Sequence, residues 1–342
     1  MRFRFLLGLA LAAGLVSPCS GATPERPSPL ERAHAAILER LDAARRFLGA
    51  DVANDIVGRL DDDLGYETAE VPPDYTAAAW SETLANIVRL DVELTDQVVA
   101  GTAQPLGAVR GLHENFVRVR DGTFQPIAVF VPPGYDASKQ HSLIVALHGR
   151  PQSESELLAQ PVLRNLAAAS DSIVVAPWGR GNYDFAEPAA SEIYDAVNSA
   201  EAAFAIDRHK VYLVGYSMGG FAVFRVAPLH PERWAGIMSI SGAIVNSEVA
   251  SFVSACRNVN LYVVNGAKDE SIPSKYGEQT ATFLRSSGLA VGFYQEPEGK
   301  HALRTLNRVL GLAWTDMLAG RARRDLDSPS GPRNPGGPIH PS

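Results

Sequence analysis

The sequence predicts an α/β protein whose core is an open, mostly parallel β-sheet flanked by helices. Between residues 113 and 320, short apolar runs alternate with helix-like stretches, which is the pattern of strands alternating with helices. Two runs, Ser142–Leu147 and Ser172–Ala176, are apolar almost throughout, as strands buried on both faces are. A third run, Val211–Val214, leads directly into a glycine-rich turn and a helix-like stretch.

Size and charge restrict the classes of protein to consider. The chain has 342 residues, 46% of them hydrophobic and 20% charged, which is enough for one large core or one core with a small extra domain. The net charge is −7, and no basic patch interleaved with aromatic residues is present. Because phosphate binding needs clustered Lys and Arg, we expect no nucleic-acid partner.

The first 22 residues resemble a secretory signal. A charged start, Met1–Arg4, precedes an apolar run, Phe5–Val16, and small residues follow. We expect cleavage after Ala22, with Ser20 at the −3 position. The apolar run is short for a transmembrane helix, which argues against an uncleaved anchor. We therefore expect an exported protein, periplasmic or secreted, with no membrane span.

Cys19 leaves open a lipid anchor. Leu15–Cys19 resembles the box in which bacterial lipoproteins carry their acylated cysteine, but Pro18 stands where a small residue is expected. We treat lipidation as the minority interpretation. Cleavage after Ala22 leaves Cys256 alone, so no intrachain disulfide is expected, and Cys256 is predicted to be a small buried apolar residue.

Residues 23–110 are predicted to form an α-helical segment. Apolar residues recur at helical spacing within Glu31–Gly49, Val52–Leu60 and Thr76–Val99, and Pro72-Pro73 interrupts the pattern. The segment is either a packing appendage or a cap over a functional site. Because it carries no obvious chemistry, we favour the packing appendage.

An α/β domain is predicted over residues 111–320. It begins with an antiparallel hairpin, in which Phe116–Arg120 and Pro126–Pro132 are joined by a turn at Asp121-Gly122. The tail, residues 321–342, is rich in Pro and Gly without apolar periodicity and is predicted to be disordered. The remaining predicted strands are Ser142–Leu147, Ser172–Ala176, Val211–Val214, Ala235–Ile240, Leu261–Val264 and Val291–Gln295, and the predicted helices are Glu154–Ala169, Ser191–Ala205, Gly220–Leu229, Ser274–Ser287 and Ala302–Ala319.

The turn after Val211–Val214 carries a candidate nucleophile. It reads Gly-Tyr-Ser-Met-Gly, with Ser217 in the middle and Gly215 and Gly219 at its ends. On a sharp strand-to-helix turn such a serine hydroxyl is exposed at the sheet edge, and the glycines allow close backbone approach. The alternative is an ordinary glycine-rich turn. A base and an acid in suitable positions decide between the two.

His301 is the predicted base. In sites of this kind an acid and then a histidine follow the serine along the chain. Three histidines follow Ser217: His230 near the end of the next helix, His301 after the last strand, and His340 in the tail. Only His301 leaves a strand at the edge where catalytic groups gather.

Asp269 is the predicted acid, because it follows the strand Leu261–Val264 at the same edge of the sheet. Glu270 is its direct rival, and Asp269 is preferred because a Gly-x-x-Asp turn followed by Pro273 suits the position. The alternative for both is a solvated turn. The other acidic residues lack such a strand-end position: Glu232, Glu248, Glu278, Glu296 and Glu298.

Two main-chain N–H groups are needed to bind an oxyanion. Met218, next to the serine, is the first candidate. Arg150 is the second, with Gly149 as the alternative, because Leu147-His148-Gly149-Arg150 follows a buried strand. His148 is then structural. No His, Asp and Cys residues show the spacing of metal ligands, so we expect no metal.

Trp178, Asn182 and Tyr183 are candidates for substrate binding. They lie in the stretch that follows the strand Ser172–Ala176, at the edge of the sheet predicted to hold the site. Simple loop packing explains them equally well.

These motifs together resemble the α/β-hydrolase superfamily, and within it exported esterases and prolyl-oligopeptidase-like hydrolases. The resemblance rests on the Gly-Tyr-Ser-Met-Gly-Gly turn, the Leu-His-Gly upstream, the Asp-Glu-x-x-Pro turn and the late Gly-Lys-His. It is supported by Ala176–Asn182 and by the Ile-Asp-x-x-Lys-Val-Tyr-Leu before the serine, and it covers about residues 113 to 320. It implies an acyl-serine intermediate that water hydrolyses, and no cofactor.

The predicted function is that of a serine hydrolase, most simply a carboxylic ester hydrolase acting on a small or oligomeric ester. A peptidase of the same fold remains an alternative, because ester and amide cleavage use the same groups. A non-catalytic binding protein is the less favoured one, since a fold alone does not define an activity.

Overall fold

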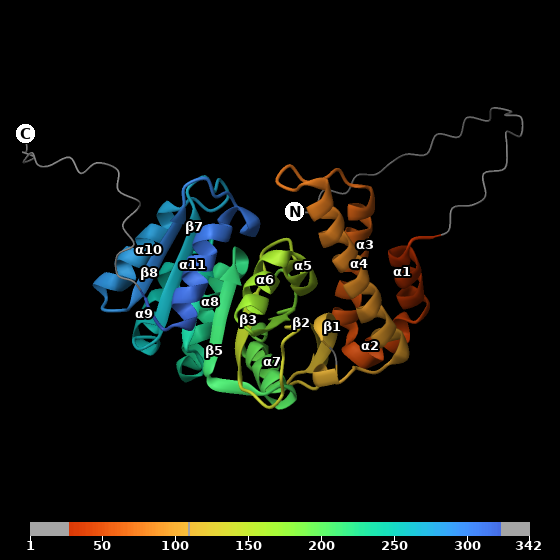
Figure 1. Cartoon of the computed structure of the whole chain (residues 1–342). Helices are drawn as coiled ribbons and strands as arrows, with labels where there is room; N and C mark the ends of the chain where they lie inside the picture. Colours follow the sequence, from red (N-terminus) through yellow and green to blue (C-terminus); the bar gives the residue numbers. More distant parts are fainter. Residues whose placement is uncertain (1–26, 109, 323–342) are drawn as a thin grey trace, which may run out of the picture.

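The computed structural model describes residues 27–108 and 110–322. The expected signal sequence, Cys19, His340 and residues 323–342 of the expected disordered tail lie outside the described residues, whereas Arg321, at the start of that tail, pairs with Asp316 at 3.5 Å. Within them, a helical segment comes first and a sheet-containing body follows (Figure 1).

One eight-stranded sheet forms the centre of the body, with strand order β1-β2-β4-β3-β5-β6-β7-β8. β1 pairs antiparallel with β2, and β2 pairs antiparallel with β4, whereas all later neighbours are parallel. The predicted sheet class and the edge hairpin are therefore confirmed. The strands are β1 (Gly111–Arg118), β2 (Phe124–Val131), β3 (His141–Leu147), β4 (Ile173–Pro177), β5 (Ile206–Tyr216), β6 (Gly236–Ile240), β7 (Asn260–Gly266) and β8 (Val291–Glu296).

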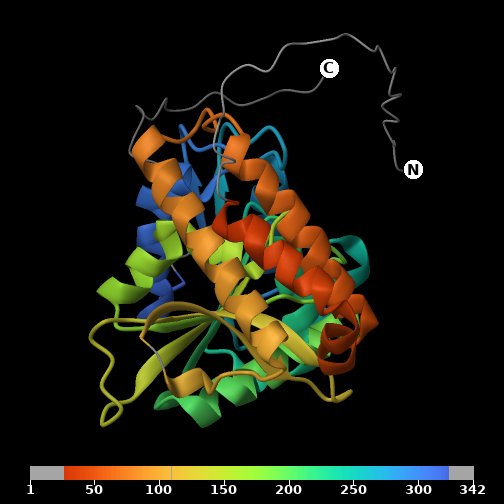
Figure 2. The same ribbon diagram turned by 90° about the vertical axis from the view of Figure 1, so that its right-hand side faces the viewer.

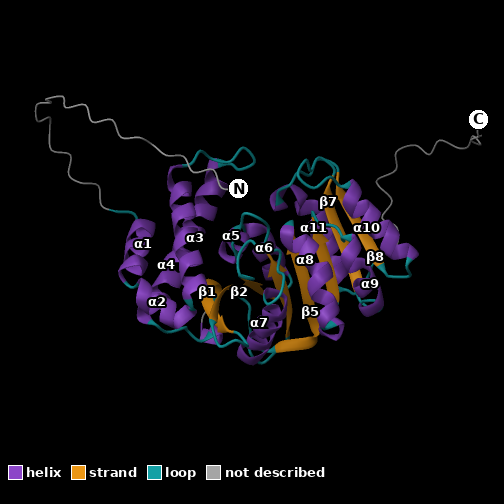
Figure 3. Cartoon of the chain, turned by 180° about the vertical axis from the view of Figure 1, so that it is seen from behind, coloured by secondary structure: helices purple, strands orange, loops and turns teal. Residues whose placement is uncertain are grey.

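Helices cover both faces of this sheet, as Figure 3 shows. One face packs on α7 (Ala189–Ala203), α8 (Met218–Val226), α9 (Asn246–Ala255) and α10 (Lys275–Ser286). The other face packs on α5 (Glu154–Ala159), α6 (Pro161–Ala169) and α11 (Asn307–Leu318). Cys256 is fully buried in the first of these two cores. In the described part of the chain, no helix is long and apolar enough to cross a membrane.

The helical segment has a core of its own and packs against the β1–β2 edge of the sheet (Figure 2). Its helices are α1 (Pro29–Glu39), α2 (Leu41–Leu48), α3 (Ala50–Thr68) and α4 (Ala77–Ala100). Phe47 stacks on Phe124 of β2 with ring centroids 4.9 Å apart, and meets Phe116 of β1 edge-on at 5.7 Å. These aromatic contacts pack α2 on the β1–β2 hairpin.

The structure differs from the predicted elements in several places. The helical stretch within Glu31–Gly49 is two helices, α1 and α2, and the helix predicted over 302–319 begins at Asn307, after a short 3₁₀ turn. The helix predicted over 154–169 is two helices, because Pro161 has no N–H with which to continue the first. β5 begins at Ile206, before the apolar run that revealed it. Helix α9 was not predicted; Phe252 is its single fully buried side chain, so it has no apolar stripe to detect.

Candidate active site

Ser217 lies on the predicted sharp turn, between the end of β5 and the start of α8. Its backbone has φ 51° and ψ −114°, a region that non-glycine residues rarely adopt. A Cβ at Gly215 would lie 2.0 Å from the Gly219 carbonyl oxygen, and one at Gly219 would lie 2.3 Å from that of Leu147. Both positions therefore require glycine, and together they allow the chain to turn this tightly.

His301 reaches the serine from the loop that follows β8. Its Nε2 is 2.9 Å from Ser217 Oγ, which is hydrogen-bond distance. The Tyr216 hydroxyl donates to the His301 carbonyl at 2.9 Å, and the two rings lie 5.3 Å apart. The residue beside the serine therefore also holds the histidine loop in place.

Asp269 lies behind His301, in the loop after β7. One carboxylate oxygen is 2.8 Å from His301 Nδ1, and the other accepts the Ser271 and Ile272 N–H groups at 3.0 and 2.7 Å. Burial favours a higher pKa for this carboxyl, but the hydrogen bonds from His301 and Ile272 outweigh it, so the pKa lies below its ordinary value. Asp269 is thus held as an anion, whereas its rival Glu270 is exposed.

The structure brings together the three side chains that the sequence singled out. Asp269, His301 and Ser217 form one hydrogen-bonded chain at the carboxyl ends of β5, β7 and β8. His230 is elsewhere: its ring is 55% exposed and pairs with Glu232 at 3.3 Å. Chemically, the chain can pass the serine proton to His301 while the carboxylate stabilises the imidazolium.

The loop after β3 lies against the serine. A Cβ on Gly149 would be 3.1 Å from Ser217 Cβ, and the Gly149 N–H donates to Gln152 Oε1 at 3.1 Å. Within residues 27–108 and 110–322, the main-chain N–H groups of Arg150 and Met218 donate to no protein acceptor. Because the Gly149 N–H is occupied, Arg150 is the better candidate for the second oxyanion donor.

His148 is fully buried and lies between two carbonyl groups. Its Nδ1 is 2.9 Å from the Gly149 oxygen, and its Nε2 is 2.9 Å from the Trp178 oxygen. It ties the loop after β3 to the loop after β4, which matches its predicted structural role.

The three predicted substrate-binding residues are placed differently from one another. Trp178 and Tyr183 line a cavity of about 540 Å³ between the start of α3 and the loop after β4, while Asn182 is not among its lining residues. The Asn182 carbonyl instead accepts from the Arg150 guanidinium. The cavity lining includes neither the serine nor the histidine, so this cavity is separate from the reacting atoms.

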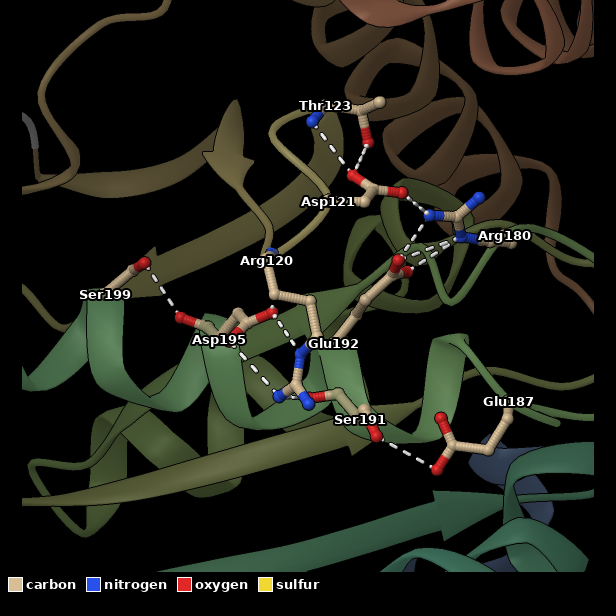
Figure 4. Close-up of polar contacts among 9 residues, drawn as sticks. All are labelled: Arg120, Asp121, Thr123, Arg180, Glu187, Ser191, Glu192, Asp195 and Ser199. Carbon is tan, nitrogen blue, oxygen red and sulfur yellow. Dashed lines mark hydrogen bonds and ion pairs between the residues drawn. The ribbon is translucent and has the colours of Figure 1, made fainter.

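A network of ion pairs holds the loop after β4 (Figure 4). The Arg180 Nε lies 3.0 Å from both carboxylate oxygens of Glu192 in α7, and its Nη2 lies 2.6 Å from Asp121 in the β1–β2 turn. The hydrogen bond to Glu192 raises the pKa of the Arg180 guanidinium, which stays charged. Arg120 makes a parallel contact with Asp195, also in α7, at 3.2 Å. The cavity wall is thus fixed to the sheet edge.

Two contacts of the site were not predicted from the sequence. Gln152 occupies the Gly149 N–H, and Tyr216 supports the loop of His301. The position of Tyr216 inside the glycine-serine motif was a usable signal, because the residue before the serine must lie beside it. Gln152 offered no signal.

Part of the chain is similar in sequence to known hydrolases. A family model described as Phospholipase/Carboxylesterase matches residues 185–307, a range that contains the serine, the aspartate and the histidine. A protein of Aspergillus terreus named probable feruloyl esterase C is 26% identical over 171 residues, which cover 46% of this chain and 60% of that protein. The match thus spans less than two thirds of that relative.

Solved structures agree in fold. A fluorophosphonate-binding serine hydrolase of Staphylococcus aureus superposes with a TM-score of 0.54 at 14% identity, covering 61% of this chain and 98% of that one. A structure described as a ferulic acid esterase has a TM-score of 0.50 at 17% identity, with the same coverage of 61% and 98%.

Proposed function

Because this chain belongs to the α/β-hydrolase superfamily, we propose that it is a serine hydrolase that cleaves carboxylic esters through an acyl-serine intermediate. The observation that carries the proposal is the hydrogen-bonded chain from Asp269 through His301 to Ser217, with distances of 2.8 and 2.9 Å. The carboxylesterase family match and the feruloyl esterase relative support an ester as the substrate.

In the proposed first step, Ser217 Oγ attacks the ester carbonyl carbon while His301 Nε2 takes the hydroxyl proton. Asp269 holds the imidazole so that Nε2 faces the serine, and it stabilises the positive charge that His301 acquires. His301 then gives its proton to the departing alkoxide, the carbon–oxygen bond breaks, and an alcohol leaves. The acyl group remains on the serine as an ester.

In the second step, His301 takes a proton from water, and the hydroxide attacks the acyl carbon. The bond to Ser217 Oγ breaks, the serine recovers its proton from His301, and the carboxylic acid leaves. In both steps the carbonyl oxygen becomes an anion, for which we assign the N–H groups of Met218 and Arg150. No cofactor takes part.

The acyl group to test first is a hydroxycinnamate. The reason is the name of the Aspergillus terreus relative, a probable feruloyl esterase. Methyl ferulate, compared with p-nitrophenyl esters of increasing acyl length, shows whether an aromatic acid is preferred. A set of aminoacyl p-nitroanilides in the same screen tests the peptidase alternative.

The role of the serine is tested by covalent labelling. A fluorophosphonate probe is expected to label the purified protein, and Ser217→Ala is expected to abolish labelling and to lower ester turnover by at least about 10³-fold. Ser172→Ala, at a buried serine that precedes β4, is the matched control and should label like the wild type. Equal labelling of Ser217→Ala would remove Ser217 from the mechanism.

We also propose that the enzyme is exported, on the charged and apolar pattern of residues 1–22. N-terminal sequencing of protein recovered from the cell envelope and the medium tests this. A mature chain beginning at Thr23 supports cleavage after Ala22, and an acylated Cys19 supports the lipoprotein alternative instead.

A further inference from the structure

The connection between α3 and α4 lies beside the loop that carries His301. In Figure 1 this connection (orange) is on the same side of the molecule as the loops that follow β7 and β8 (blue). Its last residues before α4 include Asp74 and Tyr75, which contact side chains close to His301 in sequence. The helical segment therefore reaches the candidate active site.

Asp74 and Tyr75 make four contacts with this loop. The Asp74 carboxylate lies 3.0 Å from Arg304 Nη2 and 3.5 Å from Lys300 Nζ, and the Asp74 carbonyl accepts from Arg304 Nε. The Arg304 guanidinium also lies 3.7 Å from the centroid of the Tyr75 ring, a cation–π distance. Two adjacent residues, Asp74 and Tyr75, thus contact residues on both sides of His301 in the chain.

These contacts complete the support of the histidine loop. On one side, the Tyr216 hydroxyl holds the His301 carbonyl at 2.9 Å. Within the loop, Thr305 Oγ1 accepts the Lys300 N–H at 2.9 Å. Asp74 holds Lys300 and Arg304 from the remaining side. The loop has no regular pairing with a strand at His301, so these contacts help to hold the loop, while the hydrogen bond to Asp269 orients the imidazole.

The same connection is braced against the loop of the proposed oxyanion donors. Tyr75, Trp80 and Tyr66 form an edge-to-face row with centroids 5.3 and 5.7 Å apart. The Tyr66 hydroxyl donates to Glu156 of α5 at 2.9 Å, and Glu156 caps that helix at Ser153. These contacts therefore link the connection to the start of α5, the helix that directly follows the loop of the proposed oxyanion donors.

We propose that Asp74 is a positioning residue, which acts through Lys300 and Arg304 to hold His301 in line with Ser217. This inference rests on the proposed function. It assigns the helical segment a part in the active site in addition to its packing. A displacement of about 1 Å in a catalytic group is enough to slow catalysis strongly, so loosening this loop should lower kcat more than it changes KM.

The test is Asp74→Asn, with Glu70→Gln as the matched control, because Glu70 is an exposed carboxylate in the same connection. With p-nitrophenyl acetate, Asp74→Asn is expected to lower kcat by roughly 10-fold and to leave KM within about twofold. Asp74→Glu, which keeps the charge, should recover part of the rate. Glu70→Gln should match the wild type.

The salt dependence of kcat distinguishes a positioning role of Asp74 from a purely structural one. At about 1 M NaCl the screening length is about 3 Å, so the partly exposed ion pairs of Asp74 with Lys300 and Arg304 are weakened. The kcat of the wild type should then fall towards that of Asp74→Asn, whose own kcat should not change with salt. A salt response equal in both proteins would overturn the inference.

Fluorophosphonate labelling separates this inference from the proposed function. If the wild type is not labelled, the proposed function fails, and this inference with it. If the wild type is labelled and Asp74→Asn reacts as fast as Glu70→Gln, the inference alone fails. Should Asp74→Asn not fold, Arg304→Gln, which removes the charge that Asp74 holds, is measured in its place, against Arg233→Gln, which removes an ion pair with Glu201 before β6. Unchanged kcat in Arg304→Gln would equally overturn the inference.

Discussion

At the scale of single residues, the groups around Asp269 determine that its carboxylate stays ionised and orients His301. Its side chain is fully buried, which by itself opposes ionisation, yet three donors converge on its two oxygens. The lowered pKa that results means that the carboxylate is charged throughout the neutral range. A carboxylate held in this way can only accept hydrogen bonds, and so it selects the tautomer of His301 that bears a proton on Nδ1.

Replacing this residue should therefore change the tautomer. Asp269→Asn is expected to lower kcat for ester hydrolysis by about 10⁴-fold, because an amide N–H₂ facing Nδ1 favours the tautomer with its proton on Nε2. Steady-state kinetics with p-nitrophenyl acetate measures the effect. Glu270→Gln, at the exposed neighbour, is the control and should stay within about twofold of the wild type. A loss below about tenfold in Asp269→Asn would show that Asp269 is not the acid of the site.

At the scale of secondary-structure elements, a buried charge cluster joins the helical segment to the α/β body. Arg59 of α3 contacts Glu154 and Ser155 of α5 at 2.5 and 2.6 Å, and it pairs with Asp91 of α4. Asp63, also of α3, lies 3.8 Å from its Nε. One guanidinium thus binds carboxylates from three helices, and α5 directly follows the loop of the proposed oxyanion donors.

Removing the guanidinium should leave buried carboxylates without their cation. Arg59→Met is expected to lower the free energy of unfolding by about 3–5 kcal/mol, the cost of breaking a buried ion pair from one side. Chemical denaturation measures it. Arg46→Met, at an exposed arginine of α2, is the control and should change stability by less than about 0.5 kcal/mol. If both variants unfold at the same denaturant concentration, the cluster does not hold the segment.

At the scale of the whole molecule, this cluster makes stability depend on pH. Burial and the neighbouring charge of Asp91 raise the pKa of Asp63 to about 10. Burial and Glu154 likewise raise the pKa of Glu114, which lies in β1 and is 1% exposed. The folded protein therefore keeps protons on carboxyl groups that the unfolded chain would release, and these protons offset the excess of negative charge around the guanidinium.

The sign of the pH dependence follows from these raised pKa values. The stability that Asp63 contributes to the folded protein is fully present below its unfolded pKa of 3.8. It is lost as the pH rises towards its folded pKa of about 10. The free energy of unfolding should therefore decrease between about pH 5 and pH 9, by up to about 1 kcal/mol per pH unit. Denaturation curves across this range, compared with Asp63→Asn, test it.

The variant should show a shallower decrease, because an amide does not titrate. Asp62→Asn, at the exposed neighbour, should follow the wild type. Identical pH slopes in wild type and Asp63→Asn would contradict the raised pKa. The pH dependence due to Asp269 has the opposite sign, because its pKa is lowered. The stability that it contributes to the folded protein is present above pH 3.8 and is lost as the pH falls below that value.

Several features could be predicted from the sequence because they depend on short, local stretches of residues. Val211–Val214 and the glycines around Ser217 are a local pattern, and the structure gives a local reason for it, a turn that admits no Cβ at Gly215 or Gly219. Chain order then led to Asp269 and His301, since parallel strands end at the same sheet edge. The structure brings these side chains into contact; their catalytic roles remain predictions for the kinetic tests.

Other features could not be found in this way. The chain order that led to the histidine gives no hint of Asp74, which lies 230 residues before the arginine that it binds, Arg304. Nothing local in the sequence distinguishes Asp74 from any exposed acidic residue before a helix. Nothing local in the sequence marks Arg59 or Glu114 either, and only their burial reveals the charge cluster.

By itself, the amino-acid order determined the class of fold, the direction of most strands and the turn that presents the serine, because each depends on neighbours within a few positions. The tertiary structure alone decided which N–H groups near the serine stay free, which carboxyls keep their protons, and that a helical connection touches the histidine loop. Those properties depend on desolvation and on distances between residues far apart in the chain, and neither is expressed in any local pattern of side chains.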